Sequence, residues 1–143
     1  MVKGVTVAIT QDIPVQKKTI HKLVAFLKKE LQFSIQALEI TFVTGADIHS
    51  INKLYLNHDY MTDIITFDYS DTAGTLVGEL IISPDIAHAN AKKYNIPYTE
   101  ELVRLVIHGI LHLLTYDDKT APEKKIMFSL QEALVRKSIL FLK

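Results

Sequence analysis

The amino-acid sequence predicts an α+β fold in which about five helices pack against a mixed sheet of four strands. Segments with strand and helix periodicity follow the order β-α-β-α-β-β-α-α-α, so the helices are interspersed among only four strands. The chain has 143 residues, 48% of them hydrophobic, which is enough for one core without disulfides. No repeat, linker or low-complexity tract interrupts it. We therefore expect residues 1–143 to form a single domain.

The first half of the chain alternates strands with helices. Apolar residues alternate along residues 5–10, which predicts a strand, and Pro14 is a favourable opening residue for a helix over 15–31. Residues 37–44 have the composition of a strand, and 47–56 form a short helix with one apolar stripe. This half therefore supplies two strands and two helices.

The next segment predicts a hairpin and a helix start. Strands over 63–69 and 76–82 are separated by 71–74, a turn of hairpin length. Ser83 and Pro84 then suit the cap and first position of a helix, because a hydroxyl can accept from a free backbone N–H and proline needs no donor there.

The last third of the chain is helical. The helix after Pro84 should run to about Tyr94, and Thr99 is expected to cap the next one. A break over 115–121 separates that helix from the last, which Pro122 opens and which should end near Leu140. Three consecutive helices therefore follow the final strand.

The helix after Thr99 carries two histidines four positions apart. Residues at this spacing share one helix face, so His108 and His112 can direct ring nitrogens to one metal ion, with Asp118 as the nearest candidate third ligand. The helix is apolar almost all round and should be buried, and buried imidazoles need partners. The alternative is that both histidines are core residues satisfied by hydrogen bonds.

The spacing resembles the zinc helix H-E-x-x-H, but Gly109 occupies the glutamate position. That glutamate is the general base of zinc peptidases, so their usual mechanism lacks its base here. Glycine also disfavours a helix by about 1 kcal/mol relative to alanine. This indicates that backbone or substrate approaches the helix closely at Gly109.

Composition narrows the function classes. Cysteine is absent, which excludes disulfides and thiolate metal sites and suits a reducing cytoplasm. No apolar run is long enough to span a membrane, and the N-terminus has the alternation of a strand rather than a signal peptide. Sixteen basic and sixteen acidic residues give zero formal net charge, so RNA binding would need local patches. Two patches are candidates: Lys17, Lys18, Lys22, Lys28 and Lys29 in the first helix, and Lys119, Lys124 and Lys125 after the histidines.

A longer pattern surrounds the two histidines. His108-Gly109, Leu111-His112-Leu113 and Tyr116-Asp117 match the signature H-G-x-L-H-L-x-G-Y-D-H. This signature is typical of the YbeY family of bacterial metal-dependent endoribonucleases, or ribosomal RNA maturation factors, which the chain resembles over nearly its whole length. A second family block, L-N-x-x-Y-R-x-x-D-x-x-T-D-V-L-S-F, and the strand after it are matched at Asn52, Tyr55, Asp59, Thr62-Asp63, Phe67 and Gly78-Glu79-Leu80-Ile81-Ile82.

The resemblance implies an endoribonuclease that processes small-subunit ribosomal RNA by means of water activated by a metal. The implied ion is Zn²⁺ held by His108, His112 and Asp118, where Asp118 replaces the family's third histidine. Carboxylate oxygen binds zinc at about the same distance as imidazole nitrogen, and it also suits Mn²⁺ or Mg²⁺. The implied partners are ribosomal RNA and ribosomal proteins, and the implied location is the cytoplasm.

Two further departures from the family pattern bear on mechanism. Thr115 replaces the signature glycine, so the left-handed chain reversal that such a glycine often supplies after a helix must be made differently. Leu56 replaces an arginine, and leucine cannot neutralise phosphate in the transition state. His58, two positions further on, is a candidate substitute as a cation or general acid, although a loop histidine can equally be only exposed.

No strong general base is apparent. Asp117 and Glu79 could each accept a proton, but Asp117 could equally orient a histidine ring or bond the helix end. Two further functions therefore remain open. One is a metal-stabilised ribosome-assembly factor that does not cut RNA, which Leu56 and the missing base favour. The other is a metal-dependent hydrolase of a peptide or ester bond, supported only by the H-x-x-x-H spacing.

Overall fold

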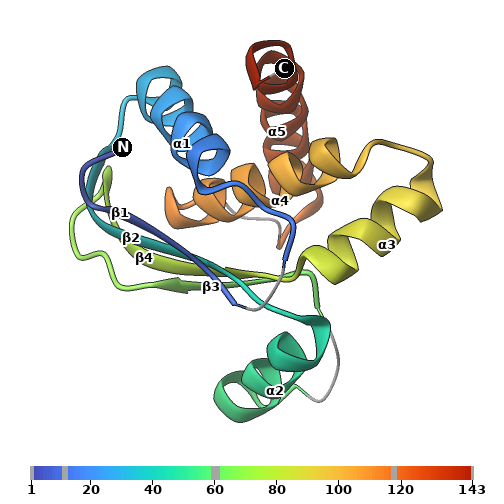
Figure 1. Cartoon of the computed structure of the whole chain (residues 1–143). Coiled ribbons are helices and arrows are strands. Elements are labelled where there is room, and N and C mark those ends of the chain that lie inside the picture. Colours follow the sequence, from blue (N-terminus) through green and yellow to red (C-terminus); the bar gives the residue numbers. More distant parts are fainter. Residues whose placement is uncertain (1, 11–12, 59–61, 117–118, 143) are drawn as a thin grey trace.

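The computed structural model describes residues 2–10, 13–58, 62–116 and 119–142. Its four-stranded sheet has the order β1-β2-β4-β3 (Figure 1). Strands β1 (Val5–Ile9), β2 (Ser34–Phe42) and β4 (Thr75–Ile82) are parallel, and β3 (Ile64–Asp68) pairs antiparallel with β4 at the edge. The predicted mixed sheet and the hairpin between its last two strands are confirmed.

Five helices surround the sheet in the described part of the chain: α1 (Lys17–Leu31), α2 (Gly45–Leu56), α3 (Pro84–Tyr94), α4 (Tyr98–Leu113) and α5 (Ala121–Leu142). Helices α1, α4 and α5 lie on one face of the sheet, and α2 lies on the other (Figure 1). Helix α4 packs against α3, α5 and the strands β3 and β4. None of these helices combines the length and the hydrophobicity that a membrane span requires.

Alternation along β4 separates two apolar cores. Leu80 and Ile82 belong to the larger core with the helices α1, α4 and α5, whereas Ile81 contacts the smaller one around Ile48 of α2. Helix α4 contributes buried side chains on nearly every side, including the fully buried Ile107 and Ile110. The prediction of a buried helix carrying the two histidines is confirmed.

Gly109 lies where α4 crosses the sheet. A Cβ atom at this position would stand 2.8 Å from Ile64 Cδ1 and 2.8 Å from Leu80 Cδ2. Such distances are well inside van der Waals contact, so a larger residue would push the helix off the strands. Close approach was expected here, but the prediction that backbone or substrate makes it was wrong: apolar side chains of β3 and β4 do.

Some element boundaries differ from the predicted ones. Strand β2 begins at Ser34, three residues early, because its pairing with β4 shifts between Ile35 and Ala37 and this bulge interrupts the alternating pattern. Thr44, expected to end the strand, instead caps α2 by accepting from the Asp47 backbone N–H at 3.1 Å.

Of two predicted caps, one is in the predicted position and the other is not. Ser83 occupies the cap position of α3 and Pro84 opens the helix, as predicted, but the buried Ser83 hydroxyl has no hydrogen-bond partner among the described residues. Helix α4 begins at Tyr98, so Thr99 lies inside its first turn and Pro97 occupies the cap position. Neither helix therefore starts with a hydrogen bond from a cap side chain.

Thr115 makes the reversal that ends α4. Its φ angle is 73°, in the left-handed region that β-branched residues rarely adopt. The Thr115 N–H donates to His112 O at 3.0 Å, and the Tyr116 N–H donates to Leu111 O at 3.1 Å. This hydrogen-bond pair defines a Schellman motif, usually built on glycine. The expectation of a different reversal was therefore wrong: threonine adopts the left-handed conformation itself, in spite of its side chain.

Candidate metal centre

The two histidines lie together at the C-terminal end of α4. The ring centroids of His108 and His112 are 4.7 Å apart, with the rings nearly perpendicular at 78°. Both side chains are partly exposed, although the helix around them is buried. Imidazoles one turn apart at a partly open helix face can direct nitrogens to a shared ion.

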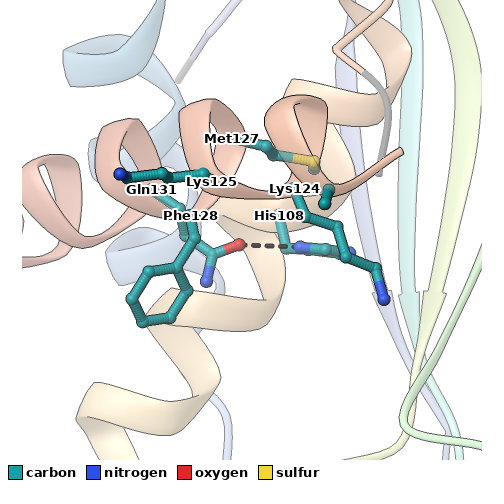
Figure 2. A pocket seen from close by; sticks show the side chains of 7 residues that line it. His108, Lys124, Lys125, Met127, Phe128 and Gln131 are labelled. Carbon is teal, nitrogen blue, oxygen red and sulfur yellow. Dashed lines mark hydrogen bonds between the residues drawn. The ribbon is translucent and has the colours of Figure 1, made fainter. Parts of the chain in front are cut away.

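A buried glutamine of α5 contacts the first histidine. Gln131 Oε1 lies 2.7 Å from His108 Nδ1, a short hydrogen bond across the α4–α5 interface (Figure 2). Gln131 Nε2 donates in turn to Glu132 Oε2 at 3.2 Å. The amide oxygen therefore faces the imidazole, and because an oxygen of this kind only accepts, the hydrogen bond forms in the ring form that carries a proton on Nδ1. In the neutral ring of that form, Nε2 keeps its lone pair for another partner.

An arginine of α4 holds Glu132. Arg104 Nε and Nη2 each donate to a Glu132 oxygen at 2.8 Å, and Arg104 also bonds Glu100 and Glu101 at 3.1 Å. These donated bonds lower the pKa of Glu132 because they stabilise its charged form. For Glu101, burial is the larger effect and raises its pKa despite the same arginine. Glu132 is therefore an ionised, fixed acceptor beside Gln131.

An open pocket of about 520 Å³ lies between α4 and α5, next to His108. Its lining combines cationic and aromatic groups, which Figure 2 shows around the hydrogen bond between Gln131 and His108. We call it the α4–α5 pocket, and its lining residues are His108, Ala121, Lys124, Lys125, Met127, Phe128 and Gln131. Phe128 is 62% exposed, unusual for a phenylalanine that serves only packing.

The predicted third ligand, Asp118, and the predicted catalytic Asp117 lie outside the described residues. Within the described ranges, no group of three His, Asp or Glu side chains is placed to hold a metal ion. The two histidines nevertheless suit zinc or a similar ion, because His108 Nδ1 already donates to an oxygen and leaves Nε2 to coordinate. The assignment of Asp117 and Asp118 stays a prediction.

The other candidates lie on elements other than α4. His58 follows α2 in the sequence, and its side chain is exposed. Leu56, at the end of α2, is 40% exposed. Glu79 alternates with Leu80 along β4, so it faces away from α4, and burial and Glu39 raise its pKa. The suggestion that Glu79 serves the histidines as a base was therefore wrong, whereas the role of His58 stays a prediction.

Gln131 was missed in the sequence, although a signal for it exists. It interrupts an apolar stripe of α5 at helical spacing, between Met127 and the pair Leu134 and Val135. A polar residue in such a stripe is expected to be buried with a partner. The spacing alone does not identify His108 as that partner, because 23 residues separate the two.

Comparison with known proteins gives relatives from several bacteria. The endoribonuclease YbeY of Azobacteroides pseudotrichonymphae is 46% identical over 99 residues, covering 68% of this chain and 70% of that protein. The protein of the same name from Bacteroides fragilis is 47% identical over 91 residues, 62% of this chain and 65% of its own length. That from Cytophaga hutchinsonii is 36% identical over 118 residues, 82% of each chain.

The fold has a solved counterpart. The solution structure of a Thermotoga maritima protein aligns with a TM-score of 0.69 and 27% identity, covering 94% of this chain and 88% of that one. The family model described as endoribonuclease YbeY matches residues 6–138, which include all of the sheet except Val5, the two histidines and Gln131. The chain therefore belongs to the endoribonuclease YbeY family.

Proposed function

We propose that this protein is a metal-dependent endoribonuclease that hydrolyses internal phosphodiester bonds during maturation of small-subunit ribosomal RNA. The observation that carries the proposal is the pair His108 and His112, held on a buried helix within a chain of this family. Curated relatives carry the name endoribonuclease. The absence of cysteine suits action in a reducing cytoplasm.

We propose Zn²⁺ as the ion, with His108, His112 and Asp118 as its ligands. When bound, the ion supplies Lewis-acid chemistry that promotes ionisation of water and polarises a phosphoryl oxygen. The protein's part is to hold each of the two imidazoles with an unprotonated ring nitrogen toward the ion. The Gln131 contact to His108 Nδ1 supports this role for His108. A carboxylate ligand would also allow Mn²⁺ or Mg²⁺.

The α4–α5 pocket offers a path for the RNA beside the histidines. Lys124 and Lys125 carry positive charge that can pair with phosphates, and the exposed ring of Phe128 can stack with an unpaired base. These cations would compensate for Leu56 at the position where an arginine is expected. The substrate strand is therefore proposed to be unpaired where it passes His108.

Proton transfer is assigned to Asp117 and His58 as a proposal. Asp117 stands four positions after the last residue of α4, so it is close along the chain to the metal ligands, and a carboxylate there can accept a proton from the attacking water. His58 would act as a cation or general acid toward the RNA. Imidazole suits either role because its charge changes near neutral pH.

Leu56 favours one alternative, a metal-stabilised assembly factor that binds ribosomal RNA or a ribosomal protein without cutting. Its partly exposed apolar side chain offers no charge to the transition state. The two functions differ in a single observable, the appearance of new RNA ends. Binding without new ends is the signature of the alternative.

The test is cleavage of purified ribosomal RNA by the zinc-loaded wild type, His112→Ala and His88→Ala. His88 lies exposed on α3, so its variant controls for loss of a histidine and for contaminating nuclease. We expect His112→Ala, checked for folding by circular dichroism, to lose at least 100-fold in rate, because an activated nucleophile and a positioned phosphate are lost together. His88→Ala should cut normally. A chelator should stop the wild type until zinc is restored.

Equal cutting by wild type and His112→Ala would identify a contaminant and overturn the catalytic proposal. No cutting by any variant, combined with tight RNA binding, would establish the assembly factor instead.

A further inference from the structure

We propose that Gln131 is a positioning residue that fixes His108 in the single neutral tautomer able to bind the metal ion through Nε2. The inference rests on the proposed metal centre and adds a residue outside the signature around the two histidines. It concerns the tautomer of His108 in the metal-free protein.

The orientation of the Gln131 amide follows from its two neighbours. Glu132 is an ionised carboxylate, which only accepts, so the nitrogen of the amide must face it, at 3.2 Å. The oxygen then faces His108 Nδ1 at 2.7 Å and needs a donor there. A flipped amide would place an oxygen against the Glu132 carboxylate and lose both bonds. Only one arrangement of amide and imidazole therefore satisfies all partners.

Arg104 makes this arrangement rigid. It binds both oxygens of Glu132 at 2.8 Å and is itself held by Glu100 and Glu101. A two-point contact of this kind restricts the carboxylate in rotation as well as in position. A continuous chain of donors and acceptors therefore runs from Arg104 through Glu132 and Gln131 to His108.

Burial makes the contact to the histidine specific. Gln131 is 7% exposed, so water competes weakly for its amide, and an unpaired amide there would be unfavourable. In the absence of Gln131, the neutral ring could carry its proton on either nitrogen. One of these two tautomers carries the proton on Nε2, where the metal must bind. The same contact also fixes the rotation of the ring.

The alternative is that Gln131 merely satisfies a buried polar group and has no effect on the metal. The two readings differ in the tautomer of His108 and in metal affinity, neither of which depends on RNA. Gln131→Leu removes the acceptor with little change in volume. Ser138→Ala, on the same helix and fully buried, is the matched control.

The experiment combines two measurements on the full-length protein. In the metal-free protein, ¹⁵N nuclear magnetic resonance of the imidazoles should show His108 protonated on Nδ1 in wild type and Ser138→Ala. In Gln131→Leu both tautomers should be populated. Zinc affinity, measured by competition with a chromophoric chelator, should fall roughly 10- to 100-fold in Gln131→Leu. It should stay at the wild-type value in Ser138→Ala.

Protonation of wild-type His108 on Nε2, or unchanged zinc affinity in a folded Gln131→Leu, would overturn the proposal. Should Gln131→Leu fail to fold, the wild-type spectrum still decides it, since a His108 ring protonated on Nε2 contradicts it. If the tautomer and affinity behave as expected but no variant cuts RNA, the positioning role stands and the proposed nuclease function fails.

Discussion

At the scale of single residues, Thr115 next to the two histidines adopts a backbone conformation that is unfavourable for a β-branched side chain. Its left-handed φ of 73° forces a β-branched side chain against the backbone, whereas glycine adopts this conformation freely. We expect Thr115→Gly to raise the free energy of unfolding by about 1 kcal/mol, a net value after the extra chain entropy of glycine in the unfolded state. Urea unfolding measures this free energy. The melting temperature of Thr115→Gly should also be about 2–4 °C higher than that of the wild type.

Thr99→Gly is the matched control for this prediction. Thr99 lies exposed in the first turn of α4, where glycine loses helix propensity and gains nothing in conformation. That change should lower the free energy of unfolding by up to about 1 kcal/mol. Destabilisation by Thr115→Gly as well would mean that the Schellman reversal carries no strain from threonine.

At the scale of elements, the approach of α4 to the sheet depends on Gly109. A methyl group there would stand 2.8 Å from Leu80 Cδ2, in a core without free volume, and overpacking typically destabilises by about 1–3 kcal/mol. Alanine also favours the helix by about 1 kcal/mol. We therefore expect Gly109→Ala to lower the free energy of unfolding by about 1 kcal/mol, measured by urea unfolding.

A double-mutant cycle separates packing from helix propensity. Leu80→Val removes a terminal carbon near the new methyl group, so Gly109→Ala should be less unfavourable in that background by at least about 0.5 kcal/mol. An identical effect in both backgrounds would show that the Leu80 side chain does not limit the approach of the helix.

The elements themselves were largely predictable, and their ends were not. Periodicity over ten or more residues identifies α1 and α4 because burial of one face stabilises the whole helix. A boundary depends on one or two local bonds. Thr44 was assigned to a strand because it continues β2 in sequence, yet its hydroxyl accepts from the Asp47 N–H. The bulge after Ile35 likewise hid the first residues of β2.

At the scale of the whole molecule, the site was only half predictable. His108 and His112 are neighbours by helical spacing, which the sequence displays directly. The contact from Gln131 exists only because α5 folds back on α4, and the Arg104 to Glu132 pair crosses the same interface. Contacts between different helices have no fixed separation in the sequence. Only the polar Gln131 within the apolar stripe of α5 therefore indicated them.

The net formal charge of zero makes RNA binding depend on where the cations lie. Lys124 and Lys125 line the α4–α5 pocket, whereas Lys28 and Lys29 form a similar exposed pair on α1. Neutralising a lysine that contacts phosphate reduces the salt dependence of binding, because fewer counterions are released. The Lys124→Gln, Lys125→Gln double variant should therefore bind a single-stranded ribosomal RNA fragment more weakly at low salt. Its plot of log affinity against log salt concentration should be shallower by up to about 1.4.

Fluorescence anisotropy at several potassium chloride concentrations measures this slope. The Lys28→Gln, Lys29→Gln variant has the same charge and should keep the wild-type slope, since α1 does not line the α4–α5 pocket. Equal losses in the two variants would mean that RNA is attracted by total charge, and the proposed path beside His108 would be wrong. A loss confined to Lys124 and Lys125 would place the RNA backbone next to the two histidines, as hydrolysis at that centre requires.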